Sequence, residues 1–157
     1  MTEDRRGIIP FIVSIAIPVC VGMLSALLTR EEMAAFGSLN KPPLAPPSWL
    51  FSVAWTILYI LMGIACYFIY ISDSELRMLS LLIFGMQLFF NFFWSLIFFN
   101  LEMYWLAFVW LLAMWVMIIA LLVLTSKFSL IAMFCLLPLA IWSTFAAYLN
   151  AGIAVLN

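Results

Sequence analysis

Charged residues divide this sequence into five long runs that carry no charge and consist mostly of apolar side chains. A membrane-spanning α-helix needs about 20 apolar residues to cross roughly 30 Å of hydrocarbon, and each run reaches that length. The pattern predicts an all-α integral membrane protein, a single domain over residues 1–157 with a long first loop at 29–48. We expect the five spans at about residues 7–28, 49–71, 76–99, 104–124 and 130–153.

The first loop is much longer than the roughly 2–8 residues that usually join helices in a bundle, and loops of this length are usually functional. Thr29 with Glu32 fits a capping box and Gly37 fits a helix end, so we expect a short helix inside the loop. The proline-rich strip that follows should be rigid and non-helical. It is a candidate lid, made of Lys41, Pro42, Pro43, Leu44, Pro46 and Pro47. A plain solvated linker is the alternative.

Several of the predicted helices carry small, polar and aromatic residues on one face. In the first span, small residues recur every four positions, which favours close packing against another helix: Ser14, Pro18, Gly22 and Ala26. In the second span Trp55, Tyr59 and Gly63 have the same spacing, so an indole, a phenol and a gap share one face. The third span has one face with Gln87, Asn91, Trp94, Ser95 and Phe98, and the fifth has a stripe with Trp142, Ala146, Leu149, Asn150 and Ile153.

These faces have two interpretations that the pattern leaves open. Amides inside hydrocarbon need hydrogen-bond partners, so they either join helices or contact a ligand. The tryptophans either fill the bundle and its interfaces or line a pocket. Trp105, Trp110 and Trp115 advance five residues at a time and do not share a face, so Trp110 or Trp115 could face the bundle.

Composition and charge narrow the class of protein. Hydrophobic residues make up 69% of the chain, charged residues 8%, and mean hydropathy is +1.27, which is far more apolar than a soluble domain. The net charge of −1, with scattered Lys and Arg, leaves no basic patch and argues against nucleic-acid binding. The chain has no histidine, so metal chemistry is not expected. Cys20, Cys66 and Cys135 lie in apolar runs and are interpreted as buried free thiols.

The positions of the ionisable residues bear on function and orientation. None lies near the middle of a span, where ion-coupled carriers use such groups, so ion coupling is disfavoured. Aromatic, amide and small side chains beneath a rigid loop suit a large, flat, mostly apolar ligand. Four basic residues fall on the N-terminal side of a five-span bundle and two on the other: Arg5, Arg6, Arg77 and Lys127 against Arg30 and Lys41. This bias predicts a cytoplasmic N-terminus.

Four motifs follow one another along the chain: KPPLAPP at 41–47, VAWTILYILMG at 53–63, QLFFNFFWSLIFF at 87–99 and LPLAIWSTFAAYLNAGI at 137–153. Together they resemble the TspO/MBR family of tryptophan-rich sensory proteins, which includes the mitochondrial translocator protein. The resemblance covers essentially the whole chain. It implies five transmembrane helices, a homodimer in membrane lipid, here a bacterial cell membrane, and a pocket beneath the first loop that binds porphyrins, some sterols and synthetic benzodiazepine-site drugs.

The resemblance also implies roles for particular residues. Trp55 and Trp142 match tryptophans that line the pocket and are tied to porphyrin breakdown in bacterial members. Spacing and resemblance together nominate these ligand-binding residues: Trp55, Tyr59, Gln87, Asn91, Trp94, Phe98, Trp110, Trp142, Phe145, Ala146 and Asn150. Leu44 and Leu139 stand where the family often has aromatic residues. Because the chain ends at Asn157 without the basic tail of animal members, sterol binding through such a tail is not expected.

Three functions are consistent with these features. The first is a membrane receptor or carrier that binds protoporphyrin or a haem-like tetrapyrrole for sensing, sequestration or transport, with porphyrin as ligand and no required cofactor. The second is light- and oxygen-dependent porphyrin degradation, with Trp55 and Trp142 as participants. A conventional enzyme is not expected without a metal ligand or an acid–base pair. The third is a structural or partner-regulating membrane protein whose pocket is incidental.

Overall fold

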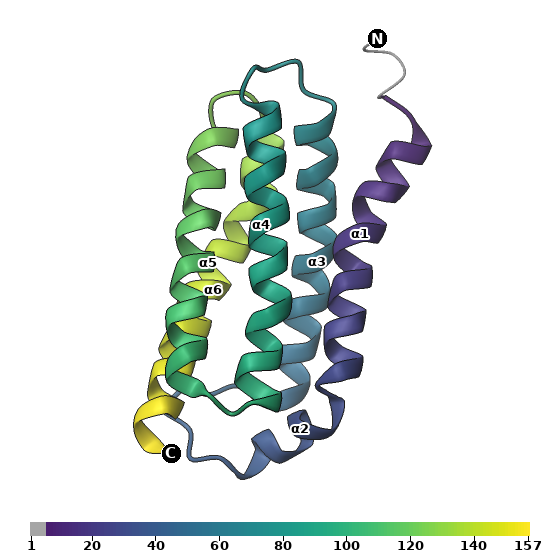
Figure 1. Ribbon diagram of the computed structural model, residues 1–157. Coiled ribbons are helices and arrows are strands. Elements are labelled where there is room, and N and C mark those ends of the chain that lie inside the picture. The colour runs from purple at the N-terminus through teal and green to yellow at the C-terminus, as the bar shows by residue number, and fades with distance from the viewer. Residues whose placement is uncertain (1–5) are drawn as a thin grey trace.

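Five long helices form the body of the protein, as Figure 1 shows. The computed structural model describes residues 6–157, except for the side chains of 33–35, so Arg5 of the charge count lies outside the described residues. The long helices are α1 (Ile8–Leu28), α3 (Ser48–Tyr70), α4 (Arg77–Ser95), α5 (Tyr104–Thr125) and α6 (Leu130–Leu156). A π-helical turn, η3 (Leu96–Asn100), continues α4. Within the described residues five helices are long and apolar enough to cross a membrane, which confirms the predicted fold class.

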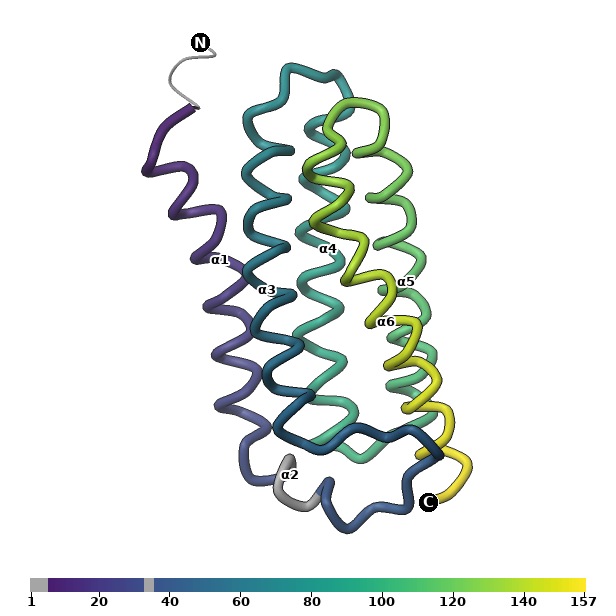
Figure 2. The backbone as a smooth tube through the Cα atoms, turned by 180° about the vertical axis from the view of Figure 1, so that it is seen from behind, coloured from purple at the N-terminus to yellow at the C-terminus, as the bar shows by residue number. Residues whose placement is uncertain are grey.

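The first loop closes one end of the bundle. It contains the predicted short helix, α2 (Arg30–Ala35), followed by a single 3-10 turn, η2 (Phe36–Ser38). In Figure 2 the chain leaves α1, passes beneath the bundle to the C-terminus and returns to the start of α3. The loop therefore spans the bundle end instead of hanging free. The last helix runs to Leu156, past the predicted end at 153, and its final turn meets the loop.

Close packing of α1 on α3 depends on two glycines. A Cβ atom at Gly63 would lie 2.5 Å from the Ile15 Cα of α1, and one at Gly22 would collide with the ring of Tyr59. Ser14 and Pro18 are also buried, as expected of a small-residue face, whereas Ala26 is exposed. Lipid tails are as apolar as the helix surfaces, so the hydrophobic effect does not drive membrane helices together. Their association depends on close van der Waals contacts such as these.

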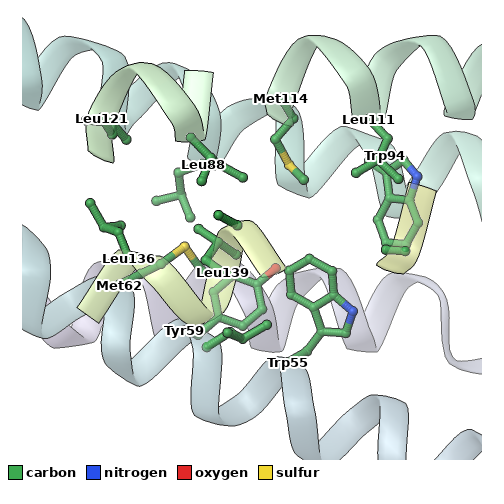
Figure 3. Packing of buried hydrophobic residues seen from close by; sticks show 14 of the residues in the cluster. Trp55, Tyr59, Met62, Leu88, Trp94, Leu111, Met114, Leu121, Leu136 and Leu139 are labelled. Carbon is green, nitrogen blue, oxygen red and sulfur yellow. The ribbon is translucent and has the colours of Figure 1, made fainter. Parts of the chain in front are cut away.

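The core changes character along the bundle axis. Figure 3 shows aliphatic and thioether side chains, such as Leu121, Leu136 and Met62, on one side and the indoles of Trp55 and Trp94 on the other. The aliphatic half lies toward the α5–α6 turn, and the aromatic half lies toward the first loop. Aromatic residues are therefore concentrated where the loop covers the bundle.

The interpretation of all three cysteines as buried thiols is wrong for Cys20. The three thiols are free, but Cys20 is exposed on α1 and Cys66 and Cys135 are only partly buried. An apolar run shows that a helix crosses the membrane but not which side of it faces lipid, and α1 is packed on one side only.

We expect Gly63→Ala to destabilise the bundle, because its methyl group would overlap the backbone of α1. The cost of such overpacking is roughly 1–3 kcal/mol, which lowers the unfolding temperature by several degrees. Thermal unfolding in detergent measures this change in unfolding temperature. Gly85→Ala is the matched control, because a Cβ at Gly85 meets nothing within 4 Å. Alanine should leave the control as stable or more stable, and equal shifts in the two variants would contradict the packing argument.

Candidate functional site

The aromatic half of the core is centred on Phe51 of α3. Its ring centroid lies 6.2 Å from Trp55 on the same helix, 6.4 Å from Trp94 on α4 and 5.9 Å from Trp142 on α6. The ring centroid of Phe36, from η2 in the loop, lies 6.4 Å from that of Phe51. Four segments that are distant in sequence thus bring their rings to one place beneath the loop.

Tyr59 and Asn91 link α3 to α4 next to this cluster. The Tyr59 hydroxyl donates a 2.7 Å hydrogen bond to Oδ1 of Asn91, and the Tyr59 ring lies 5.8 Å from that of Trp55. Figure 3 shows the phenol and the indole side by side. The bond satisfies the phenol in a region without water and fixes the orientation of the Asn91 amide.

Asn150 serves as a structural link between helices. Its Oδ1 accepts from Nε1 of Trp94 at 3.1 Å, and its Nδ2 donates to the Tyr104 carbonyl at 2.8 Å. The side chain thereby ties α6 to α4 and α5. Gln87 also reaches across the bundle, where its Nε2 lies 3.4 Å from the Met62 sulfur.

Other polar atoms in the core have no partner among the described residues. They are Nε1 of Trp55, Nε1 of Trp142, Nδ2 of Asn91, Oε1 of Gln87 and the hydroxyls of Ser80 and Ser143. Buried polar groups are normally satisfied, and each exception needs an explanation. Two indole N–H groups and one amide N–H, all donors, belong to residues nominated from the sequence. A ligand with acceptor atoms would satisfy such donors.

Two cavities adjoin the aromatic cluster. The larger has a volume of about 190 Å³ and lies between α1, α3 and the end of α4. Its lining includes Trp55, Tyr59 and Trp94, which were nominated, and Gly22, Ser25 and Thr29 of α1, which were not. A much smaller space beneath the loop, about 10 Å³, is bordered by Phe36, Phe51, Trp94, Phe98, Ala146, Leu149, Asn150 and Ile153.

Five nominated residues line neither cavity: Gln87, Asn91, Trp110, Trp142 and Phe145. Trp110 stacks on Phe90 of α4 with centroids 4.3 Å apart and donates to the Phe90 carbonyl at 2.8 Å, so it joins α5 to α4. Gln87 lies deeper in the bundle, and Phe145 packs on Trp142 at 5.7 Å. Trp142 itself reaches the cluster through Phe51 and is not part of either cavity lining.

Sequence reasoning missed the two phenylalanines at the centre of the site. Phe51 precedes Trp55 by one helical turn, so the spacing rule that grouped Trp55 with Tyr59 would also have found it. Phe36 has no such signal, because it lies in the loop and its place in the core depends on how the loop folds back.

The proline strip is fastened to the last turns of α6. Pro42 packs so closely on Gly152 that a Cβ there would lie 2.5 Å from the proline Cγ. The Tyr148 hydroxyl donates to the Pro43 carbonyl at 2.8 Å. Asn157 accepts from the Asn40 N–H at 3.0 Å and donates back to the Asn40 carbonyl at 2.9 Å. The strip is thus held across the bundle end, over the aromatic cluster.

Leu44 and Leu139, the positions at which we expected aromatic residues from the resemblance, line neither cavity. Leu44 has a φ of 69° at the outer bend of the strip and is 82% exposed, so its side chain cannot line the cavities. Leu139 is fully buried and lies beside Tyr59 and Met62 in Figure 3. Among the described residues no three His, Cys, Asp or Glu side chains come together as a metal site would require.

Comparisons with known proteins agree with this architecture. The model of the TspO/MBR family matches residues 14–156. The chain is 32% identical to the tryptophan-rich protein TspO of Archaeoglobus fulgidus over 96% of this chain and 99% of that protein. It is 33% identical to protein CrtK of Rhodobacter capsulatus over 88% and 86%, and 32% identical to the translocator protein of Bos taurus over 85% and 82%. The chain belongs to the TspO/MBR family.

Proposed function

We propose that this membrane protein is a receptor or carrier that binds porphyrins, such as protoporphyrin or haem-like tetrapyrroles, or related flat lipophiles. The observation that carries the proposal is the pair of unpartnered indole N–H groups on Trp55 of α3 and Trp142 of α6, whose rings lie 6.2 and 5.9 Å from the Phe51 ring. Indoles stack on flat apolar rings and donate to acceptors, so the pair suits a large ring with polar edges.

Binding of a porphyrin requires the aromatic cluster to open. Ligand pockets usually measure roughly 300–1,000 Å³, more than the cavity of about 190 Å³ beside Trp55. Phe51 contacts both indoles, and the Phe36 ring of the loop packs against Phe51. A ring that displaced both phenylalanines would join the two cavities and contact both indoles. Asn91, whose Nδ2 is also unpartnered, is bonded through its Oδ1 to Tyr59 in the lining of the larger cavity.

We expect the double variant Trp55→Phe/Trp142→Phe to bind protoporphyrin about tenfold or more weakly, because it loses two donors and stacking area. Titration of nanodisc-held protein in the dark, followed by quenching of the remaining tryptophans, measures the dissociation constant. Trp105→Phe is the matched control, since Trp105 is exposed on α5 and lines neither cavity.

Unchanged binding by the double variant, together with a control that behaves like the wild type, would overturn the pocket assignment. It would favour the third function, a structural or partner-regulating protein. That function further predicts that porphyrin leaves the unfolding temperature of the wild type unchanged, because a ligand that binds the folded state must stabilise it.

Degradation of the porphyrin in light and oxygen is a second candidate function. It is supported by the closeness of both indoles to the position that the ring would take, 6.2 and 5.9 Å from Phe51. An illuminated porphyrin generates reactive oxygen species that oxidise both indoles and porphyrins. In this scheme molecular oxygen is the oxidant and the protein supplies adjacent tryptophans, with no acid–base pair required.

If the tryptophans take part, illuminated wild-type protein should bleach bound protoporphyrin faster than the single variants Trp55→Phe and Trp142→Phe. Absorbance is followed at porphyrin concentrations that saturate each protein, so that weaker binding does not appear as slower reaction. An oxygen-free sample should show little bleaching. Equal rates in wild type and both variants would contradict a role for the indoles.

We further propose that the protein lies in a bacterial cell membrane as a homodimer, with its N-terminus in the cytoplasm. Arg77 begins α4 and Lys127 lies in the α5–α6 turn, whereas Arg30 and Lys41 belong to the first loop. In Figure 1 the start of α4 and the α5–α6 turn lie at the end of the bundle where α1 begins, and α2 lies at the other end. Short cytoplasmic loops carry more Lys and Arg than external ones. The first loop and the C-terminus then face outward.

Fusions test this orientation. Alkaline phosphatase, which folds only outside the cytoplasm, should be active when fused after Asn157 and inactive when inserted in the turn at 72–76. The opposite pattern would show that the loop end faces the cytoplasm. A wild-type chain without phosphatase provides the background activity.

A further inference from the structure

Phe36 is a loop residue that occupies the mouth of the aromatic pocket. Only 9% of the side chain is exposed, and its ring centroid lies 6.2 Å from Phe98 and 5.8 Å from Phe99 of η3. It also borders the small space that contains Ala146 and Asn150. A ligand that enters this space from beneath the loop therefore has to displace the Phe36 ring.

Lys41 lies directly over the Phe36 ring. Its Nζ is 4.5 Å from the centroid of the Phe36 ring, a cation–π contact in which the ring face is the partner of the ammonium. Among the residues that the structure describes, no carboxylate pairs with Lys41. The side chain is partly buried at the edge of the bundle, where a cation is less well hydrated than in free solution.

Movement of Phe36 would leave this ammonium without its ring partner. A neutral ligand would offer at most another ring face, whereas a carboxylate would offer a charge-assisted hydrogen bond. The position of Lys41 in the strip is maintained by the neighbouring contacts of Asn40 with Asn157 and of Pro42 with Gly152. The Lys41 ammonium can thus bind a carboxylate at the edge of a ligand whose apolar ring lies among the indoles.

We propose that Lys41 selects lipophiles that carry a carboxylate at the edge of a flat ring, by exchanging the face of Phe36 for that carboxylate. This inference rests on the proposed function, because it concerns the ligand class of the same pocket. It assigns Lys41 a role in specificity and Phe36 the role of a plug that competes with the ligand.

Protoporphyrin and its dimethyl ester are matched probes, since they share the ring and differ in the two carboxylates. We expect wild-type protein in uncharged phosphatidylcholine nanodiscs to bind the free acid about 3–10-fold more tightly than the ester, after correction for partitioning into empty nanodiscs. Lys41→Gln should lose most of this preference by weakening the acid alone. Partitioning cancels when the acid-to-ester ratio is compared between variants.

Two further variants, each lacking a different basic residue, distinguish a direct contact of Lys41 with the carboxylate from the general electrostatic effect of positive charge on the protein. Lys127→Gln should keep the wild-type preference, because Lys127 lies in the α5–α6 turn, away from the first loop. Arg30→Gln, at the start of α2 and exposed, should keep most of it, because the proposed contact belongs to Lys41. A preference that survives Lys41→Gln, or that Arg30→Gln removes equally, would overturn the specificity role.

Phe36→Ala provides an independent measurement. Removal of the plug should tighten binding of both probes by about threefold or more, since the ligand no longer has to displace a ring. Weaker binding of both would show that Phe36 is a wall and not a competitor, and would overturn the plug. Absence of saturable binding of either probe by wild-type protein would overturn the porphyrin function itself, together with this inference.

Discussion

Inside hydrocarbon no water is available to a polar group, so every amide, hydroxyl and indole N–H in the bundle must find a partner in the protein or in a ligand. This constraint organises the interior of the protein. Asn150 uses both ends of its amide to join α6 to α4 and α5, and the bond between Tyr59 and Asn91 joins α3 to α4. The donors that remain unpartnered on Trp55, Trp142 and Asn91 belong to the same aromatic region. Asn91 belongs to both sets, since its Oδ1 joins α4 to α3 while its Nδ2 has no partner among the described residues.

The same helix holds both the pocket and its cover. Along α6, Trp142 and Ala146 face the aromatic cluster, while Tyr148, Gly152 and Asn157 hold the proline strip. Any bending or rotation of α6 would move both at once. Proline stiffness helps here, because a rigid strip transmits a shift along its length, whereas a flexible linker would absorb it. Loop and aromatic cluster are therefore both held by α6.

Close packing of α1 explains why the larger cavity lies where it does. Gly63 lets α1 touch α3 near Ile15, so the two helices are in contact along that part of their length. Further toward the loop, small side chains such as Ser25 of α1 stand opposite the large rings of Trp55 and Tyr59, and the cavity lies between them. Small side chains on α1 thus permit contact with α3 at Gly63 and leave space beside the rings at the level of Ser25.

The sequence by itself determined the five spans, the short helix in the loop and the faces that carry Trp55, Asn91 and Ala146, because membrane thickness and helical periodicity act on local residue patterns. Tertiary structure decided which partner each side chain contacts. It assigned Asn150 and Trp110 to links between helices, exposed Cys20, and brought Phe36 from the loop into the pocket mouth. Periodicity states which residues share a face, but the partner of that face depends on how distant segments pack.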